Sequence, residues 1–428
     1  MNCYLLRYSE IGLKSYQTRK RWLETLKRNV QKGLFWSDVE YSRLDIVQGR
    51  LILYSEDSNA EKVLEKVFGL VSFSPATETR ADIGEIKDVA LSIYDETRPG
   101  SFRVTSQRVT KEFCMTSIEI NQCVGEAVYE SGGKVDLRNF ELNIGIEIIG
   151  DKAYTFYNTF RGPGGLPIGV QGTGCAIVRD FKDFASCLLF MKRGCMVDLI
   201  VLSSPMASTY IDILQGYAFE GLKILLIDKE WQIMPAMQRY LDAGIEIFVT
   251  AEPLESPENM VNLCPTELYT IEEARAALEE CNLSDVPDPV NDYRISAGCV
   301  IYYNDTILLL RRKAEKTWVL PKGGVDGMEY FRDAAMREAC EESGACNLDF
   351  KHYIGKSHYS SKDRHGQFTK DVYYYLCYSK KFEVALEYLF DSYTMLPAAE
   401  AIDLLTFEND KKIVRKAEKI RKAADRNV

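Results

Sequence analysis

The feature of this sequence that most constrains its fold is a glycine-rich segment followed by a short acidic helix, between residues 323 and 345. The segment runs G-G-V-D-G-M-E from residue 323, and after seven further residues comes R-E-A-C-E-E-S-G-A from residue 337. Because residues three and four apart are neighbours on a helix, Glu338, Glu341 and Glu342 are predicted to lie on one side of it. Glycines before the helix allow the backbone to approach these acids closely.

Three neighbouring carboxylates repel one another unless cations join them. Hard oxygen ligands at this density suit Mg²⁺ or Mn²⁺, which also bind phosphate oxygens and can activate a water molecule. The alternative is an amphipathic helix with a solvated acidic face, which explains most glutamate-rich stretches. Here glycine, arginine and glutamate all recur at fixed spacings, which a solvated face does not require.

The full spacing, G-x5-E-x7-R-E-x2-E-E-x-G followed by Ala345, resembles the box of the Nudix hydrolases. The resemblance covers roughly residues 291–407. It implies an α/β/α sandwich that cleaves a diphosphate linkage in a nucleoside diphosphate attached to another group, by metal-activated water. The implied cofactor is therefore Mg²⁺ or Mn²⁺.

The resemblance also implies roles for individual residues. Glu338, Glu341 and Glu342 are expected to be the metal ligands, while Arg337 orients these acids by ion pairing and Glu329 fixes Arg337. The motif leaves the general base open, because Glu341, Glu342 or an acid on a later loop, such as residue 363, could each serve.

The residues just before the box, W-V-L-P-K-G, are similar to those in Nudix enzymes that act on dinucleoside polyphosphates and capped RNA ends. In this interpretation Lys322 neutralises a phosphate, Gly323 lets the backbone approach it, and Trp318 stacks on a base. The alternative is a buried tryptophan and a surface lysine.

The N-terminal residues are basic, with ten Lys and Arg against five Asp and Glu in residues 1–50. A helix is predicted over residues 15–32, and basic residues lie on it or just before it, close to aromatic residues: Lys14, Arg19 and Lys20. These cations could contact phosphates, and the alternative is a solvated helix face. The segment from residue 4, Y-L-L-R-Y-S-E-I-G-L-K, resembles the start of tRNA 4-thiouridine synthetases. In that family a ferredoxin-like domain precedes a THUMP domain.

The similarity to these synthetases continues through F-R-V at residues 102–104, R-V-T-K at 108–111 and F-R-G-P-G-G-L-P at 160–167. THUMP domains bind tRNA, in this family at the acceptor end. The resemblance implies that Arg103, Arg108 and Lys111 contact RNA, by charge and matching position. Each of these residues taken alone could equally be a solvated surface residue.

The middle of the chain resembles the PP-loop ATP pyrophosphatase region of the same synthetases, with one departure. The family has a Ser-Gly-Gly-x-Asp-Ser loop whose amides hold ATP phosphates, whereas this chain has R-D-F-K-D-F at residues 179–184. The paired cysteines that would carry sulfur are also missing. We therefore expect adenylation and thiolation to be lost and this region to serve as a scaffold.

A length of 428 residues predicts roughly two to four domains. Strands alternating with helices after residue 166 predict a parallel α/β sheet, and V-P-D-P-V at 286–290 marks the last boundary. The predicted domains are a ferredoxin-like domain (1–75), a THUMP domain (76–165), a degenerate Rossmann-like PP-loop domain (166–287) and a Nudix domain (291–428). The fold class is mixed α/β and α+β.

Charge, cysteine and histidine content, and the length of apolar runs narrow the classes of protein that this sequence can represent. The net charge is −10, but residues 166–290 alone carry nineteen acids against eight bases, so the acidity is confined to one region. The twelve cysteines form no C-x-x-C pair and are expected to be reduced, and the three histidines make a Cys/His metal site unexpected. The sequence shows neither a secretory signal nor a run of about 18 apolar residues, so a cytoplasmic protein without membrane contact is expected.

The sequence as a whole predicts an RNA-binding Nudix hydrolase whose N-terminal half holds tRNA or a tRNA-like end, and whose substrate is a nucleoside diphosphate-linked compound or a capped or 5′-polyphosphate RNA. One alternative is a hydrolase of free dinucleoside polyphosphates or nucleotide sugars with a vestigial RNA module. A second is a non-catalytic tRNA-binding protein. The synthetase resemblance is compatible with a homodimer.

Overall fold

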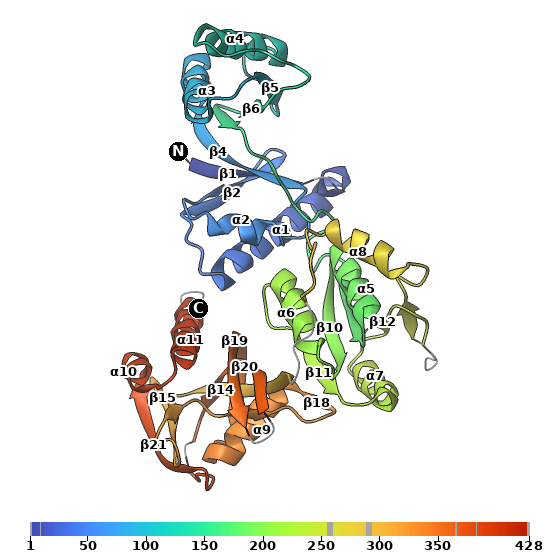
Figure 1. The fold of residues 1–428 in the computed structure, drawn as a ribbon, viewed down its shortest axis with the longest axis vertical. Coiled ribbons are helices and arrows are strands. Elements are labelled where there is room, and N and C mark those ends of the chain that lie inside the picture. Colours follow the sequence, from blue (N-terminus) through green and yellow to red (C-terminus); the bar gives the residue numbers. More distant parts are fainter. Residues whose placement is uncertain are drawn as a thin grey trace. The chain divides into compact units, whose positions relative to one another are not determined.

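The computed structural model describes residues 2–8, 10–254, 260–287, 293–363, 366–381 and 383–425, with the backbone alone for 361–363, 366, 367 and 425. The described chain divides into two compact units. The first unit comprises Met1–Gly172, Phe190–Cys195 and Ala276–Ser284; the second comprises Thr173–Leu189, Met196–Arg275 and Asp285–Val428. Each unit is built on its own sheet or sheets (Figure 1).

The first unit contains, within its described residues, a sheet of eight strands in the order β2-β3-β1-β4-β7-β6-β5, with β8 beside β4. The strands are β1 (Asn2–Arg7), β2 (Arg43–Val47), β3 (Arg50–Tyr54), β4 (Ser72–Arg80), β5 (Phe102–Arg108), β6 (Leu142–Ile149), β7 (Lys152–Phe156) and β8 (Phe160–Arg161). The helices are η1 (Glu10–Leu13), α1 (Tyr16–Trp36), α2 (Asn59–Leu64), α3 (Ile83–Thr97) and α4 (Ser117–Glu130).

Strand β4 joins the two halves of this sheet. It pairs with β1 from Ser72 to Thr77 and with β7 from Thr77 to Arg80. The predicted boundary between residues 75 and 76 falls within this strand. The carboxylate of Glu147 reinforces the junction, because it accepts hydrogen bonds from Arg7 Nε and Arg50 Nε, each at 2.7 Å.

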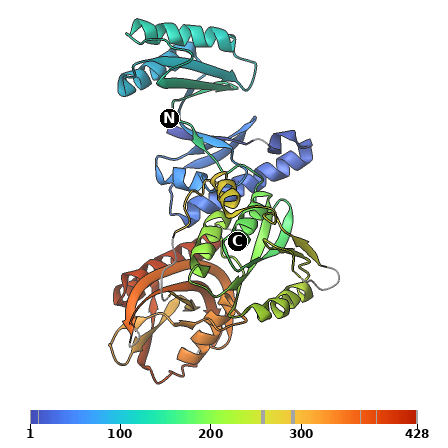
Figure 2. The same cartoon turned by 45° about the vertical axis from the view of Figure 1, so that its right-hand side comes forward.

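The helices of the first unit form where apolar periodicity and capping coincide. Helix α1 buries Trp22, Leu26 and Val30, a spacing of four that keeps them on one face. Helix α4 begins with a capping box between Thr116 and Glu119. Helices α3 and α4 lie on the same side of β5 and β6, where their buried residues share one core (Figures 1 and 2).

The second unit begins with a sheet in the order β13-β12-β9-β10-β11-β18. Its first strands are β9 (Gly172–Val178), β10 (Cys195–Leu202), β11 (Ile224–Ile227), β12 (Ile247–Val249) and β13 (Val261–Leu263), and its helices are α5 (Phe181–Lys192), α6 (Ala207–Ala218), η2 (Glu230–Gln232), α7 (Ile233–Asp242) and α8 (Ile271–Glu279). The pair β10 and β11 is parallel, and β12 is parallel to both β9 and β13. The predicted parallel α/β sheet is therefore confirmed.

The C-terminal sheet has the order β16-β15-β14-β20-β19, with β17 beside β14 and β21 beside β15. Its strands are β14 (Tyr293–Tyr303), β15 (Thr306–Arg312), β16 (Trp318–Val319), β17 (Lys322–Gly324), β19 (Leu348–Asp363), β20 (Gly366–Ser379) and β21 (Phe390–Pro397). The short strand β18 (Glu329–Tyr330) belongs to the preceding sheet. The helices are α9 (Phe331–Ser343), α10 (Ala398–Leu404) and α11 (Glu408–Asp425).

Helices α9 and α11 cover opposite faces of the C-terminal sheet. Neighbouring residues in a strand point to opposite faces, and on β20 the ring of Tyr373 packs 4.8 Å from that of Phe331 in α9. The hydroxyl of the next residue, Tyr374, donates to Asp410 Oδ1 in α11 at 3.1 Å. The domain is thus a helix–sheet–helix sandwich.

The cysteines correct one prediction. Cys340 and Cys346 form a disulfide at the C-terminal end of α9, with their Cα atoms 4.3 Å apart. Gly344 ends the helix with a φ of +79° and turns the chain back, which brings Cys346 to Cys340. Their C-x5-C spacing is neither a C-x-x-C pair nor a Cys/His metal pattern, so the sequence did not predict the pairing. None of the helices in the described ranges combines the length and apolar character needed to cross a membrane.

Candidate active site

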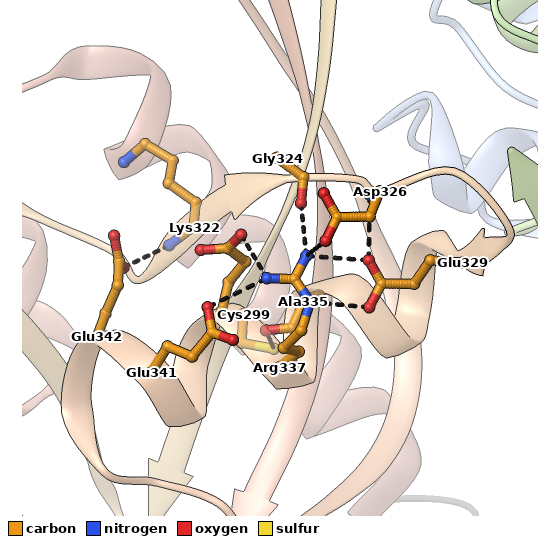
Figure 3. A network of polar contacts seen from close by, with 10 residues as sticks. Cys299, Lys322, Gly324, Asp326, Glu329, Ala335, Arg337, Glu341 and Glu342 are labelled. Atoms are coloured by element: carbon orange, nitrogen blue, oxygen red, sulfur yellow. Dashed lines mark hydrogen bonds and ion pairs between the residues drawn. The ribbon is translucent and has the colours of Figure 1, made fainter. Parts of the chain in front are cut away.

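Arg337 of α9 is the centre of the acidic site. Its Nε and Nη2 donate to the two carboxylate oxygens of Glu329, each at 2.9 Å, and Nη2 also donates to the carbonyl oxygen of Gly324 at 2.9 Å (Figure 3). On its other side Nη1 donates to Glu338 Oε1 at 2.8 Å and to Glu341 Oε2 at 3.1 Å. The arginine therefore fixes three of the predicted acids around one guanidinium, and hydrogen bonding to Glu329 contributes most to raising its pKa.

Glu342 faces away from Arg337. It is buried, and its Oε2 accepts a hydrogen bond from the backbone amide of Lys322 at 2.9 Å (Figure 3). Burial is the main cause that raises its pKa to about 7, and the nearby charge of Glu338 adds to it. Burial also raises the pKa of Glu338 itself. Burial therefore raises the pKa of both carboxylates, although the charges of Arg337 and Lys322 partly offset it.

Gly323 is required by the approach of Glu338. A Cβ atom on Gly323 would lie 1.9 Å from Glu338 Oε2, well inside van der Waals contact. Because β17 is paired with β14, the backbone at this point is held in place. A side chain at residue 323 would displace the carboxylate of Glu338.

The donor set suits a divalent cation. Glu338, Glu341 and Glu342 supply hard carboxylate oxygens from one turn of a helix, and the raised pKa values of Glu338 and Glu342 indicate that added positive charge would stabilise their ionised forms. In the part of the chain that the structure describes, no three His, Cys, Asp or Glu side chains converge on a common metal position. The reason is that Arg337 holds Glu338 and Glu341, while Lys322 holds Glu342.

Cationic side chains lie beside these acids. The Nζ of Lys322 is 3.5 Å from Asp410 Oδ2, with both side chains almost fully buried. Lys370 of β20 has a pKa lowered to about 8, chiefly by burial and then by the charges of Lys322 and Arg312. Sequence reasoning missed Lys370 and Arg312, because neither lies in a motif and only the sheet brings them near the box.

Other predicted residues of this region lie at its edge. Trp318 is half-buried in β16, where its backbone amide donates to Thr406 Oγ1 at 2.9 Å and Arg311 lies 5.8 Å from its ring centroid. The side chain of Asp363, one candidate for the general base, lies outside the described residues.

The predicted RNA contacts on β5 already have partners in the protein. Arg103 donates through Nε to Asn143 Oδ1 at 3.0 Å and lies 3.7 Å over the ring of Phe140. Arg108 donates through Nη1 to the carbonyl oxygen of Phe113 at 3.2 Å. Lys111, in the following loop, is exposed.

The predicted basic residues on α1 and just before it lie in two places. Arg19 and Lys20 line a cavity of about 660 Å³ together with Tyr8, Tyr16 and Arg50, among other residues. This combination of cations and aromatic rings suits a nucleotide. The ammonium group of Lys14 instead lies 5.1 Å over the ring of Trp22. Arg50 was not predicted, since it stands alone on β3.

The turn between β9 and α5, where a phosphate loop was expected to be lost, is filled by side chains. Arg179 donates to both carboxylate oxygens of Asp183, at 2.6 and 3.1 Å, and Asp183 Oδ1 also accepts from the amide of Ala251 at 2.7 Å. Phe184 is buried and stacks on Tyr210 with ring centroids 4.8 Å apart.

Comparison with known protein families identifies three regions. The NUDIX domain family matches residues 292–417, the ThiI ferredoxin-like domain matches 3–74, and the THUMP domain matches 80–156. The chain therefore carries a ThiI-type ferredoxin-like domain, a THUMP domain and a C-terminal NUDIX domain. The resemblances inferred from the sequence are confirmed.

Individual relatives match the N-terminal half. A probable tRNA sulfurtransferase of Thermococcus kodakarensis is 37% identical over 203 residues, covering 45% of this chain and 53% of the relative. A protein of the same description from Methanocaldococcus jannaschii is 37% identical over 210 residues, covering 46% and 55%. This chain thus spans about half the length of the curated relatives it matches.

Solved structures confirm the fold over about two thirds of the chain. A Pyrococcus horikoshii crystal structure is 29% identical with a TM-score of 0.57 and covers 66% of this chain and 100% of that one. A 4-thiouridine synthetase in complex with RNA and ATP is 20% identical with a TM-score of 0.53, covering 67% and 86%. With the NUDIX match, these findings confirm the predicted fold class of ferredoxin-like, THUMP, PP-loop-like and Nudix folds.

Proposed function

We propose that this protein is an RNA-binding hydrolase that cleaves a diphosphate linkage in a nucleotide, or in a nucleotide-capped or 5′-polyphosphate RNA. The observation that supports it most strongly is the network around Arg337. Arg337 donates to Glu329 and Glu338 on opposite sides of its guanidinium and also to Glu341, whereas Glu342 accepts from the backbone amide of Lys322. A solvated acidic helix would not need a bidentate arginine or a glycine at residue 323.

The residues of the network have separate roles in this proposal. Glu338, Glu341 and Glu342 would hold Mg²⁺ or Mn²⁺, which supplies positive charge for the diphosphate and lowers the pKa of a water molecule when bound. Glu329 keeps Arg337 in place through two hydrogen bonds. Burial raises the pKa of Glu342 to about 7, so a bound divalent cation would keep this carboxylate ionised near neutral pH.

The cations beside the acids support a substrate rich in phosphate. The side chain of Lys322 is almost fully buried and Lys370 is partly buried. The lowered pKa of Lys370 reflects this burial and the nearby positive charges of Lys322 and Arg312. An anionic phosphate chain would relieve this crowding. Trp318, half-exposed at the edge, would stack on a base.

The N-terminal half is proposed to bind tRNA. Support comes from the THUMP domain, from relatives described as tRNA sulfurtransferases, and from the cavity lined by Arg19, Lys20 and Arg50. Arg103, Arg108 and Lys111 would add phosphate contacts. In this proposal RNA is either the substrate or the molecule that locates the enzyme. In the alternative, a free-nucleotide hydrolase with a vestigial RNA module, RNA has neither role.

The PP-loop-like region is proposed to lack ATP pyrophosphatase and thiouridine synthetase activity. The ion pair between half-buried Arg179 and buried Asp183, together with the ring of Phe184, occupies the turn whose amides would otherwise approach triphosphate. Asp180, which stands where the family loop has a glycine, also opposes phosphate by its charge.

Titration of the full-length protein with tRNA at two salt concentrations tests the RNA half. Binding that weakens steeply with salt, and a flatter salt slope in Arg103→Ala, Arg108→Ala and Lys111→Ala, is expected. An unstructured RNA of the same length is the control. Equal weak binding to both RNAs would support the free-nucleotide alternative.

A further inference from the structure

The loop of the NUDIX domain that carries Glu329 is built into the sheet of the PP-loop-like region. Strand β18 pairs antiparallel with β11, with Leu225 opposite Tyr330 and Leu226 opposite Glu329 (Figure 1). The acid that holds Arg337 therefore sits on a strand whose partner belongs to another domain of the second unit.

Backbone contacts fix the residue just before this strand. Met328 has a φ of +66°, a left-handed conformation that residues with a side chain seldom adopt. Its amide donates to the carbonyl oxygen of Leu226 at 2.8 Å, and its carbonyl oxygen accepts from Arg239 Nη1 at 2.6 Å. Both polar groups of this unusual residue are thus held by the PP-loop-like region.

Side-chain packing adds a second anchor next to it. The ring of Tyr330 meets the buried ring of Tyr240 edge to face, with centroids 5.9 Å apart. The ammonium group of Lys223 lies 4.7 Å from the Tyr240 centroid and 4.8 Å from the Tyr330 centroid. Helix α9 begins directly after Tyr330, so this packing sets where the acidic helix starts.

The two segments also approach closely at the other end of the contact. A Cβ atom on Gly327 would lie 2.0 Å from Asp228 Oδ2. Gly327 lies outside the fixed positions of the box. Its missing side chain leaves room for Asp228 of the neighbouring domain and not for the acids of α9.

We propose that Arg239 is a positioning residue of the NUDIX active site, acting through Met328 and Glu329 on Arg337. The inference rests on the proposed hydrolase function. The path is continuous: Arg239 holds the Met328 carbonyl, the next residue is Glu329, and Glu329 receives two hydrogen bonds from the guanidinium that also holds Glu338 and Glu341. The PP-loop-like region, which lacks a phosphate loop, thereby acquires a new role as the support of a second domain's catalytic loop.

Arg239 is a suitable residue to substitute because it is exposed on the surface of α7. Its neighbour Gln238 is a matched control, since it is also exposed and its side chain donates to Asp242 Oδ1 of the same helix at 2.8 Å. Hydrogen exchange measured by mass spectrometry on peptides covering residues 325–335 reports the loop without requiring turnover. Hydrolysis of a dinucleoside polyphosphate in Mn²⁺ reports the site.

We expect Arg239→Ala to accelerate exchange in this loop and to lower kcat, each by about tenfold, as loss of one strong hydrogen bond would. Gln238→Ala should change neither, and Arg239→Lys, which retains a donor, should restore most of both. Because Arg239 acts through Glu329, Arg239→Ala should add no more than about twofold to the loss in Glu329→Gln. Multiplicative losses in the double variant, or unchanged exchange in Arg239→Ala, would overturn the proposal.

The exchange measurement also separates this inference from the hydrolase proposal. If the unmodified protein hydrolyses no substrate, the proposed function fails, and exchange alone decides the structural coupling. Faster exchange in Arg239→Ala would still indicate that α7 stabilises the loop before α9, whereas unchanged exchange would refute this role.

Discussion

Replacing Arg337 by lysine tests whether a forked guanidinium, and not only a positive charge, organises the site. Lysine keeps the charge but loses the two hydrogen bonds to Glu329 and the one to the carbonyl oxygen of Gly324. Hydrogen bonds to charged groups contribute about 1.5–3 kcal/mol when protected from solvent. The Arg337 and Glu329 side chains are 29% and 18% exposed, so we discount each to about 1 kcal/mol.

The three lost hydrogen bonds together amount to about 3 kcal/mol, which corresponds to roughly a hundredfold fall in kcat/KM. The assay is Mn²⁺-dependent hydrolysis of a dinucleoside polyphosphate, followed by chromatography. Arg332→Lys is the control, because Arg332 is exposed on the same helix and its Nε pairs with the adjacent Asp333 Oδ1 at 2.9 Å, away from the acids of the box. A kcat/KM for Arg337→Lys within threefold of that of the unmodified protein would refute the proposed role of the guanidinium hydrogen bonds.

Three further predictions concern other parts of the chain. Because the pKa of Lys370 is lowered to about 8, its charge is present below that pH and lost above it, so KM for a polyphosphate should rise as the pH passes through 8, and Lys370→Arg should abolish the rise. The Arg179–Asp183 ion pair should prevent ATP-dependent thiolation, so mass spectrometry of tRNA incubated with ATP and a sulfur donor should detect no thiouridine, and its appearance would contradict the proposal. Replacing Cys340 and Cys346 together by serine should cost about 2 kcal/mol of stability locally, seen as faster hydrogen exchange in the last turn of α9; unchanged exchange would show that the disulfide stabilises nothing.

The acidic site could be predicted from sequence because its main members lie on one helix and one loop. Spacing alone indicates which residues of α9 share a face, and the structure accordingly brings Glu338 and Glu341 to Arg337. The sequence likewise predicted a helix over residues 15–32, and helix α1 extends over Tyr16–Trp36. Local periodicity determines such elements, so they appear in a single sequence.

Contacts between distant segments could not be predicted in the same way. Lys370 reaches the site because β20 pairs with β14, and Arg239 reaches Met328 because β11 pairs with β18. Neither residue has a neighbour along the chain that marks it. The partners of Arg103 also depend on sheet pairing, since Asn143 lies on β6 opposite it.

The most direct test of the account is product analysis of the full-length protein. It would be incubated with a free dinucleoside polyphosphate, with nucleotide-capped tRNA and with 5′-triphosphate tRNA, each in Mg²⁺ and in Mn²⁺, beside the Glu342→Gln variant. The account predicts metal-dependent cleavage of a diphosphate bond in at least one substrate, reduced by orders of magnitude in Glu342→Gln. Absence of cleavage in every substrate, or equal cleavage by the variant, would contradict it.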